Sequence, residues 1–336
     1  MAKEIVVSGI RPTGFLHLGN YFGAIRNFVR MQQEYECYFF VADLHSLTTH
    51  SDPVQLRANG LRVVAEYLAS GLDPDQAALY RQSDVPETAE LYLMLNMLAY
   101  KGELEKVPTF KEKIRQHKDN INAGLLTYPV LMASDILLHR ATKVPVGKDQ
   151  EQHLEMARNF ANRFNNRYGY LFPEPVAFSY GGELLRIASL DGEGKMSKSQ
   201  HEMSTLFLAD SDDMIRKKIR RAKTDQGPSA PDTPMPEYIS NLFTLMRLVS
   251  SPDTVGHFEE AYANCSIRYG DLKNQLAEDM IAFISPIRAR SEALQQNPDA
   301  LERILARGAV RARESAAQTL SRAKELMGLG STRSGL

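Results

Sequence analysis

The sequence predicts an α/β protein: a doubly wound parallel sheet with a helical insertion, followed by an all-helical C-terminal domain. Three observations lead to this fold class. In residues 1–47 and 123–203, short apolar runs alternate with amphipathic helical stretches. Between them, residues 48–122 are mostly helical in pattern. From residue 204 to residue 336, the patterned stretches have the period of a helix.

The first elements follow one another in the order strand, turn, helix, strand. Residues 4–10 are rich in β-branched side chains, and residues 11–14 (RPTG) have the composition of a turn. Apolar residues recur at helical spacing from about Leu18, and residues 37–42 (CYFFVA) form a second apolar strand. This order is typical of the start of a doubly wound domain.

The middle of the chain predicts two helices, at residues 53–70 with Asp52 as N-cap and at residues 87–100. A short strand, residues 78–82, lies between them. The second helix is more apolar between residues 91 and 98 than one buried face requires. We interpret that run as core, with an oligomer face as the alternative.

The α/β pattern then resumes. Residues 125–139 and 149–165 predict helices, residues 143–146 a strand, and residues 189–200 a polar loop punctuated by glycine. Residues 111–120 are charged and predict an exposed loop or a frayed helix. The predicted C-terminal helices span residues 211–222, 236–250, 254–262, 270–296 and 299–327.

Composition excludes several classes of protein. The 336 residues, 43% hydrophobic and 24% charged, are typical of a globular protein of two or three packed units. The net charge of -1 gives no global signature of a nucleic-acid binder. Cys37 and Cys265 lack CxxC spacing, so we expect no structural metal, no disulfide and a reducing compartment. No apolar run reaches the length of a membrane span.

Residues 12–20 (PTGFLHLGN) lie between the first predicted strand and the first helix. Ligands of open parallel sheets bind at the carboxyl ends of strands, and a helix N-terminus favours phosphate. A glycine there lets a nucleotide approach the backbone. The motif therefore indicates a nucleotide site, although a solvated loop is the commoner reading of such a segment alone.

Residues 194–199 (GKMSKS) form a second motif. Lys195 and Lys198 are three positions apart on a loop made mobile by Gly192 and Gly194. Two such cations suit a transferring phosphate, whose charge builds up on the leaving pyrophosphate. A polar surface loop is the alternative.

Together the two motifs resemble the signatures of class I aminoacyl-tRNA synthetases. Residues 17–20 (HLGN) are similar to the HIGH signature, and residues 195–199 match KMSKS letter for letter. Asn20 departs from HIGH in the way that tryptophanyl enzymes commonly do. Arg11 stands where the family has glutamine, which puts that nucleotide contact in doubt. The resemblance runs from about residue 4 to about residue 327 and implies a Rossmann-like sheet of the HUP type.

The string YPVLMASDILL resembles the substrate helix of tryptophanyl enzymes. Tyr128, Met132 and Asp135 share one face of that helix. By the resemblance, Asp135 accepts the indole N–H, which fits because indole is only a donor. A pocket built around this acceptor penalises phenylalanine. A structural acid that pairs locally is the alternative.

Residues 144–153 (VPVGKDQEQH) resemble a further segment of the tryptophanyl enzymes. The resemblance implies that Gly147 and Asp149 contact the ATP ribose region and that Gln150 contacts the α-amine of the substrate. It implies three more contacts: His45 with the backbone of the amino acid, Lys113 with the ATP phosphates, and Ile187 with adenine.

The full site implied by the resemblance has three groups. The catalytic residues are His17, Asn20, Lys113, Lys195 and Lys198. The ATP-binding residues are Arg11, Pro12, Thr13, Gly19, Asn20, Gly147, Lys148, Asp149, Ile187, Lys195, Met196, Ser197, Lys198 and Ser199. The tryptophan-binding residues are His45, Tyr128, Met132, Asp135 and Gln150.

The resemblance implies a cytoplasmic tryptophan–tRNA ligase that uses ATP with Mg²⁺ and acts on tRNA(Trp). It implies a homodimer through residues 48–122 and an anticodon-binding domain at residues 204–336. Alternatives are a tyrosyl enzyme, a non-catalytic tRNA- or nucleotide-binding paralogue, and a small-molecule nucleotidyltransferase. Two basic clusters are consistent with RNA contact, although a solvated helix face is the commoner reading of any one such residue. They are Arg216, Lys217, Lys218, Arg220, Arg221 and Lys223, and Arg303, Arg307, Arg311, Arg313, Arg322 and Lys324.

Overall fold

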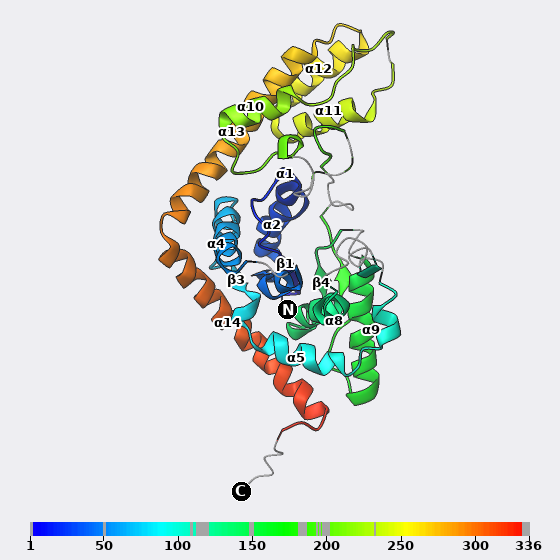
Figure 1. Cartoon of the computed structure of the whole chain (residues 1–336), viewed down its shortest axis with the longest axis vertical. Helices are drawn as coiled ribbons and strands as arrows, with labels where there is room; N and C mark the ends of the chain where they lie inside the picture. The colour runs from blue at the N-terminus through cyan, green and yellow to red at the C-terminus, as the bar shows by residue number, and fades with distance from the viewer. Residues whose placement is uncertain are drawn as a thin grey trace.

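The computed structural model covers the whole chain (Figure 1). The residues that it describes are 3–49, 52–107, 110–111, 121–147, 151–180, 187–192, 194, 196, 202–231 and 233–330.

A five-stranded parallel sheet forms the centre of the α/β unit, in the order β3-β2-β1-β4-β5. Its strands are β1 (Ile5–Ile10), β2 (Glu36–Val41), β3 (Ala77–Arg81), β4 (Lys143–Val144) and β5 (Val176–Ala177). The predicted fold class is confirmed. The fourth strand is shorter than predicted, and β5 was not predicted because two exposed residues carry no periodic signal.

Alternation along the strands builds two cores, one on each face of the sheet. Val6, Phe39 and Leu79 lie in the first core, whereas the neighbouring residues Val7 and Tyr80 lie in the second. The first face is covered by α2 (Arg26–Glu34) and α4 (Pro53–Ala69). The second face is covered by α5 (Glu87–Asn96), α8 (Ala123–Leu138) and α9 (Glu151–Tyr168). Helices on both faces explain why the strands are almost wholly apolar.

The helix predicted from Leu18 is interrupted near its start. A short α1 (Leu18–Asn20) is followed by a π-helical turn (Tyr21–Ile25) before α2 begins. Such turns are rare and often occur at functional sites. The Asp52 cap of α4 is present, since its side chain accepts from the Gln55 N–H.

β3 lies within residues 48–122, the range predicted as a helical insertion, yet it pairs with β2 in register from Cys37–Ala77 to Val41–Arg81. The helix predicted over residues 87–100 ends at Asn96. Shorter segments complete this part of the chain. They are α3 (Asp43–Ser46), α6 (Lys101–Leu104) and the 3-10 turns Leu47–Thr49 and Gln82–Asp84.

The C-terminal part is helical, as predicted. Its helices are α10 (Asp212–Arg220), α11 (Glu237–Val249), α12 (Pro252–Ala263), α13 (Tyr269–Gln295) and α14 (Pro298–Leu326). In Figure 1 the first three and the start of α13 form an upper lobe, and α13 descends beside α4. The last helix continues along β3 and α5, so α14 packs beside the α/β unit.

Among the described residues, no helix is both long and apolar enough to cross a membrane. Cys37 and Cys265 are both free thiols, the first buried and the second exposed.

Candidate active site

The segment that follows β1 is fixed as a helix start. His17 is the N-cap of α1: its Nδ1 accepts from the Asn20 N–H at 3.3 Å, and its own N–H donates to Asn20 Oδ1 at 3.1 Å. Because Nδ1 is the acceptor, a neutral His17 carries its proton on Nε2. The side chain of Asn20 and the ring of His17 therefore hold each other in place at the carboxyl end of the strand.

Neighbouring segments secure this helix start on two sides. Residues 16–18 pair antiparallel with the chain after the KMSKS loop, through Leu18 N–H to Leu206 C=O at 3.0 Å and Leu208 N–H to Leu16 C=O at 2.9 Å. The buried carboxylate of Glu66, on α4, accepts from the Leu16 N–H at 3.1 Å. Backbone hydrogen bonds thus join the HLGN segment to the segment that follows the KMSKS loop.

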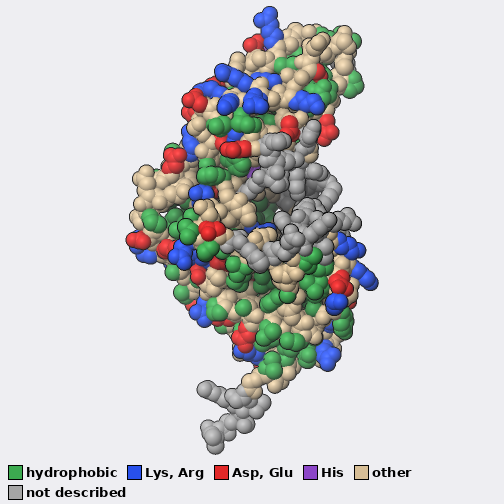
Figure 2. Space-filling model, in the orientation of Figure 1, with side chains coloured by type: hydrophobic (Ala, Val, Ile, Leu, Met, Phe, Trp, Pro, Cys, Tyr) green, Lys and Arg blue, Asp and Glu red, His purple; other side chains and the backbone are tan. Residues whose placement is uncertain are grey.

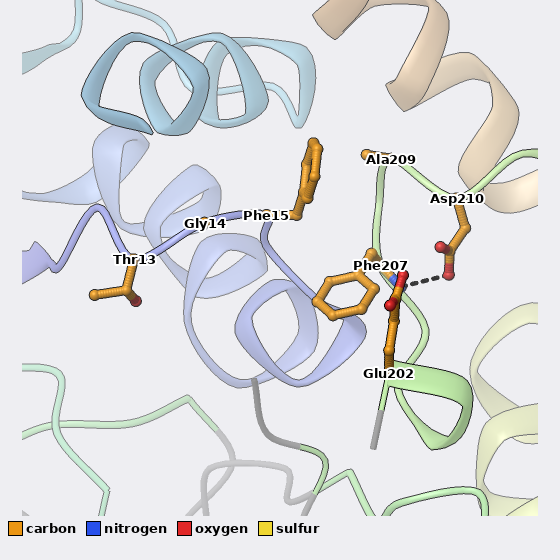
Figure 3. Close-up of a pocket in the computed structure, with 7 residues that line it drawn as sticks. All are labelled: Thr13, Gly14, Phe15, Glu202, Phe207, Ala209 and Asp210. Carbon is orange, nitrogen blue, oxygen red and sulfur yellow. Dashed lines mark hydrogen bonds between the residues drawn. The ribbon is translucent and has the colours of Figure 1, made fainter. Parts of the chain in front are cut away.

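A hollow of about 280 Å³ opens where these two segments meet. In Figure 3, Phe15 of the first segment lies opposite Phe207 and Ala209 of the second, whereas the Thr13 side chain points away from them. Gly14 has a φ of +97°, which favours glycine. The second segment contributes Glu202, Phe207, Ala209 and Asp210.

The described part of the KMSKS loop has a closed base. Met196 N–H donates to Ile187 C=O at 2.8 Å, and Ser189 N–H donates to Gly194 C=O at 3.1 Å. Both Ile187 and Met196 are buried in the first core, at 2% and 3% exposure. Gly192 has a φ of +79°, and a Cβ added there would lie 2.7 Å from Cβ of Tyr238 on α11. The loop base therefore packs directly on the helical lobe.

The predicted substrate helix places Asp135 at the centre of a buried polar cluster. Its Oδ2 lies 2.9 Å from Nε2 of His45, and Gln82 Nε2 donates to both carboxylate oxygens at 2.8 and 3.0 Å. Asp135 is 5% exposed and Gln82 1%. These side chains come from the carboxyl ends of β2 and β3 and from α8, and the fold brings them together.

Tyr128 and Met132 lie on the same helix as Asp135. Tyr128 is buried, and its hydroxyl is 2.5 Å from Nε2 of His153 on α9. Met132 is half-buried and packs against the second core. The structure thus joins Asp135 of the predicted helix face to His45, whereas Tyr128 contacts His153.

Burial sets the electrostatics of this cluster. Desolvation raises the pKa of Asp135 above its ordinary value, and the hydrogen bonds from His45 and Gln82 oppose that rise. One turn further along, burial lowers the pKa of His139 to about 3. His139 is held between Tyr80 Oη at 3.0 Å and Ser315 Oγ at 3.2 Å, so it is a neutral imidazole.

A family model described as class I tRNA synthetases (W and Y) matches residues 2–285. The chain belongs to this class I synthetase family. A tryptophan–tRNA ligase of Porphyromonas gingivalis is 57% identical, covering 97% of this chain and 99% of that protein. One of Helicobacter pylori is 42% identical, covering 98% and 100%. The predicted resemblance to bacterial-type tryptophanyl enzymes is confirmed, as is the prediction of an aminoacyl-tRNA ligase.

Solved structures agree on the fold of this synthetase. A tryptophanyl-tRNA synthetase of Campylobacter jejuni, in complex with ADP and tryptophan, has a TM-score of 0.86 at 35% identity and covers 97% of this chain and 100% of its own. A tyrosyl-tRNA synthetase of Aeropyrum pernix has a TM-score of 0.66 at 22% identity, with 90% of each chain covered. The second likeness shows the fold alone.

Several predicted site residues of the synthetase lie outside the described residues. They are Lys113, Lys148, Asp149, Gln150, Lys195, Ser197, Lys198 and Ser199. Of the others, Pro12 is buried, and Gly19 and Gly147 are half-buried. Arg11 donates to Thr49 Oγ1 at 3.1 Å, its buried Nε has no hydrogen-bond partner among the described residues, and desolvation lowers its pKa. Across the same described residues, no group of His, Cys, Asp and Glu is placed to hold a metal ion.

Sequence reasoning missed three residues of the site: Gln82, Glu66 and His153. Gln82 directly follows the third strand, and ligands of open parallel sheets bind at that end, so its position was a signal that could have found it. Glu66 gave no signal, because a glutamate on a helix is usually solvated. His153 ended a quoted motif but was given no role.

The first basic cluster is only partly available to RNA. Lys218 is fully buried, and its Nζ lies 2.7 Å from Asp210 Oδ2, so the prediction that it belongs to an RNA-binding patch is wrong. A lysine on an amphipathic helix is exposed unless its partner is buried with it, and that partner was not readable from the pattern. Arg216 pairs with Glu278 at 2.8 Å. Lys217, Arg220, Arg221 and Lys223 are exposed.

Several cations of the last helix contact the α/β unit of the same chain. Arg313 pairs with Glu87, and Arg311 donates to backbone carbonyls of Pro74 and Asp75. Figure 2 shows Lys and Arg side chains gathered on the upper lobe, over α10 and α13. Arg311 and Arg313 therefore hold α14 to the α/β unit, whereas exposed cations of the first cluster lie on the lobe.

Proposed function

We propose that this chain activates L-tryptophan with ATP and then transfers the tryptophanyl group to tRNA(Trp). The first step yields tryptophanyl-adenylate and pyrophosphate, and the second esterifies the 3′ end of the tRNA. The observation that carries the choice of amino acid is the buried carboxylate of Asp135, held by Gln82 and His45. The 57% identity to a tryptophan–tRNA ligase over nearly the whole chain supports the same activity.

Asp135 suits an indole because indole is a donor without an acceptor. The carboxylate offers about four lone-pair positions, and the three contacts from Gln82 and His45 leave one for a substrate N–H. Phenylalanine brings no donor, so its binding would leave a buried acceptor unpaired. Such a loss discriminates by about 10⁴-fold or more in sites built around a hydrogen bond.

In the activation step the tryptophan carboxylate attacks the α-phosphate of ATP. That carboxylate is ionised at neutral pH, so no general base is required. Catalysis is then positioning and charge stabilisation. The resemblance assigns the ATP phosphates to His17, whose ring is held at the start of α1 by the Asn20 N–H.

The resemblance assigns the pyrophosphate to Lys113, Lys195 and Lys198, and Mg²⁺ to the phosphate oxygens of ATP. Arg11, Thr13, Gly147, Ile187 and Met196 complete the nucleotide site in the same proposal. Ile187 and Met196 are buried and joined by a backbone hydrogen bond at the base of the KMSKS loop. This fixed base supports a role for the loop in binding the pyrophosphate.

In the transfer step a terminal ribose hydroxyl of the tRNA attacks the adenylate carbonyl. The family resemblance implies the 2′ hydroxyl. We assign catalysis to residues 1–47 and 123–203 and anticodon binding to residues 204–336. The exposed cations on α10 support an RNA-facing lobe. A cytoplasmic location follows from the tRNA substrate.

A homodimer through residues 48–122 is part of the proposal. Three large apolar side chains on α5 and the turn after it are exposed: Leu93 at 57%, Met97 at 72% and Tyr100 at 61%. Leu93 lies on α5, and Met97 and Tyr100 follow the end of that helix at Asn96. Large apolar side chains exposed together in one short segment are typical of an interface.

ATP–pyrophosphate exchange with each amino acid in turn tests the proposal. We expect exchange with tryptophan alone, and a loss of that preference in Asp135→Ala. Exchange with tyrosine would instead support the tyrosyl alternative, since an aspartate also accepts from a phenol. A lack of exchange with any amino acid would overturn the synthetase activity and leave a paralogue that binds without chemistry.

A further inference from the structure

The last helix, α14, contacts the edge strand of the sheet, β3, along the length of the strand. Before β3, the guanidinium of Arg311 donates to the carbonyls of Pro74 and Asp75 at 3.2 and 3.3 Å. In the middle of the strand, Gly308 lies against the backbone of Leu79, where an added Cβ would be 1.9 Å from the carbonyl oxygen. A helix that touches a strand this closely leaves the strand little freedom to shift.

The end of β3 is held by an ion pair with the same helix. Arg81 meets the carboxylate of Glu302 with both arms of its guanidinium, at 2.8 and 2.5 Å. Paired contacts of this kind fix orientation as well as distance. The Arg81 side chain is 19% exposed, and it also lies 3.7 Å from Asp84. Arg81 therefore links both ends of the turn at residues 82–84 to α14.

Gln82 is the first residue of that turn, and both ends of its amide have partners. Its oxygen accepts from the His45 N–H at 3.4 Å, and its nitrogen donates to both oxygens of Asp135. A small rotation of the turn would move the amide away from the carboxylate. The placement of the indole acceptor therefore depends on where β3 ends.

We infer that Glu302 is a positioning residue for the amino-acid pocket, acting through Arg81 and Gln82 on Asp135. The inference rests on the proposed function, because it assigns a specificity role to a residue of the same site. Glu302 lies on the C-terminal helix, 221 positions after Arg81. The inference therefore gives that helix a role in substrate selection. Glu302 touches no substrate, so its effect is on affinity and discrimination.

Glu302→Gln is the test variant, because it keeps the shape of the side chain and removes its charge. We expect the KM for tryptophan in ATP–pyrophosphate exchange to rise about 2- to 30-fold, the range for residues coupled through contact networks. The KM for ATP stays unchanged, and the preference for tryptophan over tyrosine falls. Glu325→Gln is the matched control, since it removes a carboxylate that pairs with Arg322 on the same helix. It should leave both KM values unchanged.

A double-variant cycle tests the route through Arg81. In an Arg81→Gln background, Glu302→Gln should have no further effect on the KM for tryptophan. Three results would overturn the inference. They are an unchanged KM for tryptophan in Glu302→Gln, an equal rise in its KM for ATP, and a full effect of Glu302→Gln in the Arg81→Gln background. If Glu302→Gln fails to fold, Arg81→Lys takes its place, because lysine keeps the charge but cannot make the paired guanidinium contact. We expect the same result, a raised KM for tryptophan and an unchanged KM for ATP.

The wild-type protein separates this inference from the proposed function. Without wild-type exchange on tryptophan, the proposed function itself fails. If the wild type catalyses exchange with tryptophan and Glu302→Gln has the same KM values, only the positioning role of Glu302 fails.

Discussion

The amide nitrogen of Gln82 lies within hydrogen-bond distance of both carboxylate oxygens of Asp135, at 2.8 and 3.0 Å. The two residues are 53 positions apart, and both are buried. Gln82 thereby stabilises the ionised form that can accept an indole N–H, against the desolvation that raises the pKa of Asp135.

Gln82→Met should weaken tryptophan binding, because methionine fills the space without donating. Loss of a hydrogen bond to a charged group predicts an increase of about 10- to 100-fold in the KM for tryptophan. Gln76→Met is the control, since Gln76 makes a comparable contact with Asp73 on the surface. Equal KM values for the two variants, measured by pyrophosphate exchange, would contradict the role of Gln82.

The KM for tryptophan should rise as the pH falls. Desolvation raises the pKa of Asp135 above 3.8, so its carboxylate takes up a proton at a higher pH than an ordinary aspartate does. The protonated form is the poorer acceptor, and tryptophan binding weakens through that window. Asp135→Asn, which cannot titrate, should have a KM that is higher but independent of pH in this range. A wild-type profile identical in shape to that of the variant would refute the assignment.

His139 should make the protein sensitive to acid. Burial lowers its pKa to about 3 in the folded state, while the unfolded chain takes up the proton below about pH 6.5. The folded state therefore loses stability as the pH falls through this interval, by about 2 kcal/mol between pH 6.5 and pH 5. His139→Gln should remove this contribution, and exposed His257→Gln should not. Denaturant unfolding at the two pH values measures the difference.

Gly308→Ala should destabilise the protein although alanine favours helices. Its Cβ would lie 1.9 Å from the Leu79 carbonyl oxygen, so α14 would have to move off β3, at about 1–3 kcal/mol. Gly256→Ala is the matched control within a helix, because open space surrounds its Cβ position. It should stabilise α12 by about 0.5–1 kcal/mol. Destabilisation of the same size in both variants would argue against the close contact.

Charge reversal at Arg221 should weaken tRNA binding without affecting the chemistry of activation. Each lost phosphate contact lowers the magnitude of the slope of log binding constant against log salt concentration by about one. We expect the KM for tRNA to rise about tenfold. Arg167→Glu, at the exposed end of α9, is the control for a general change of charge. Equal effects of the two variants on aminoacylation would mean that the α10 surface has no special role.

The sequence by itself determined the local features of this protein. Short apolar and β-branched runs predicted β1 to β3, the Asp52 cap predicted the start of α4, and helical spacing predicted a helix from about Leu18. Asp135 was identified on the correct helix, and its neighbour His45 was expected in the same pocket. Each of these signals is carried by residues a few positions apart, or by a resemblance written in such short motifs.

Only the tertiary structure decided which distant groups meet. Lys218 reads as a solvated cation until Asp210 is seen beside it, and Gln82 reads as the end of a strand until Asp135 faces it. Glu302 and Arg81 are joined across 221 positions. Periodicity states which face of an element is buried but not against what, because packing partners are selected by complementary shape and charge over the whole fold.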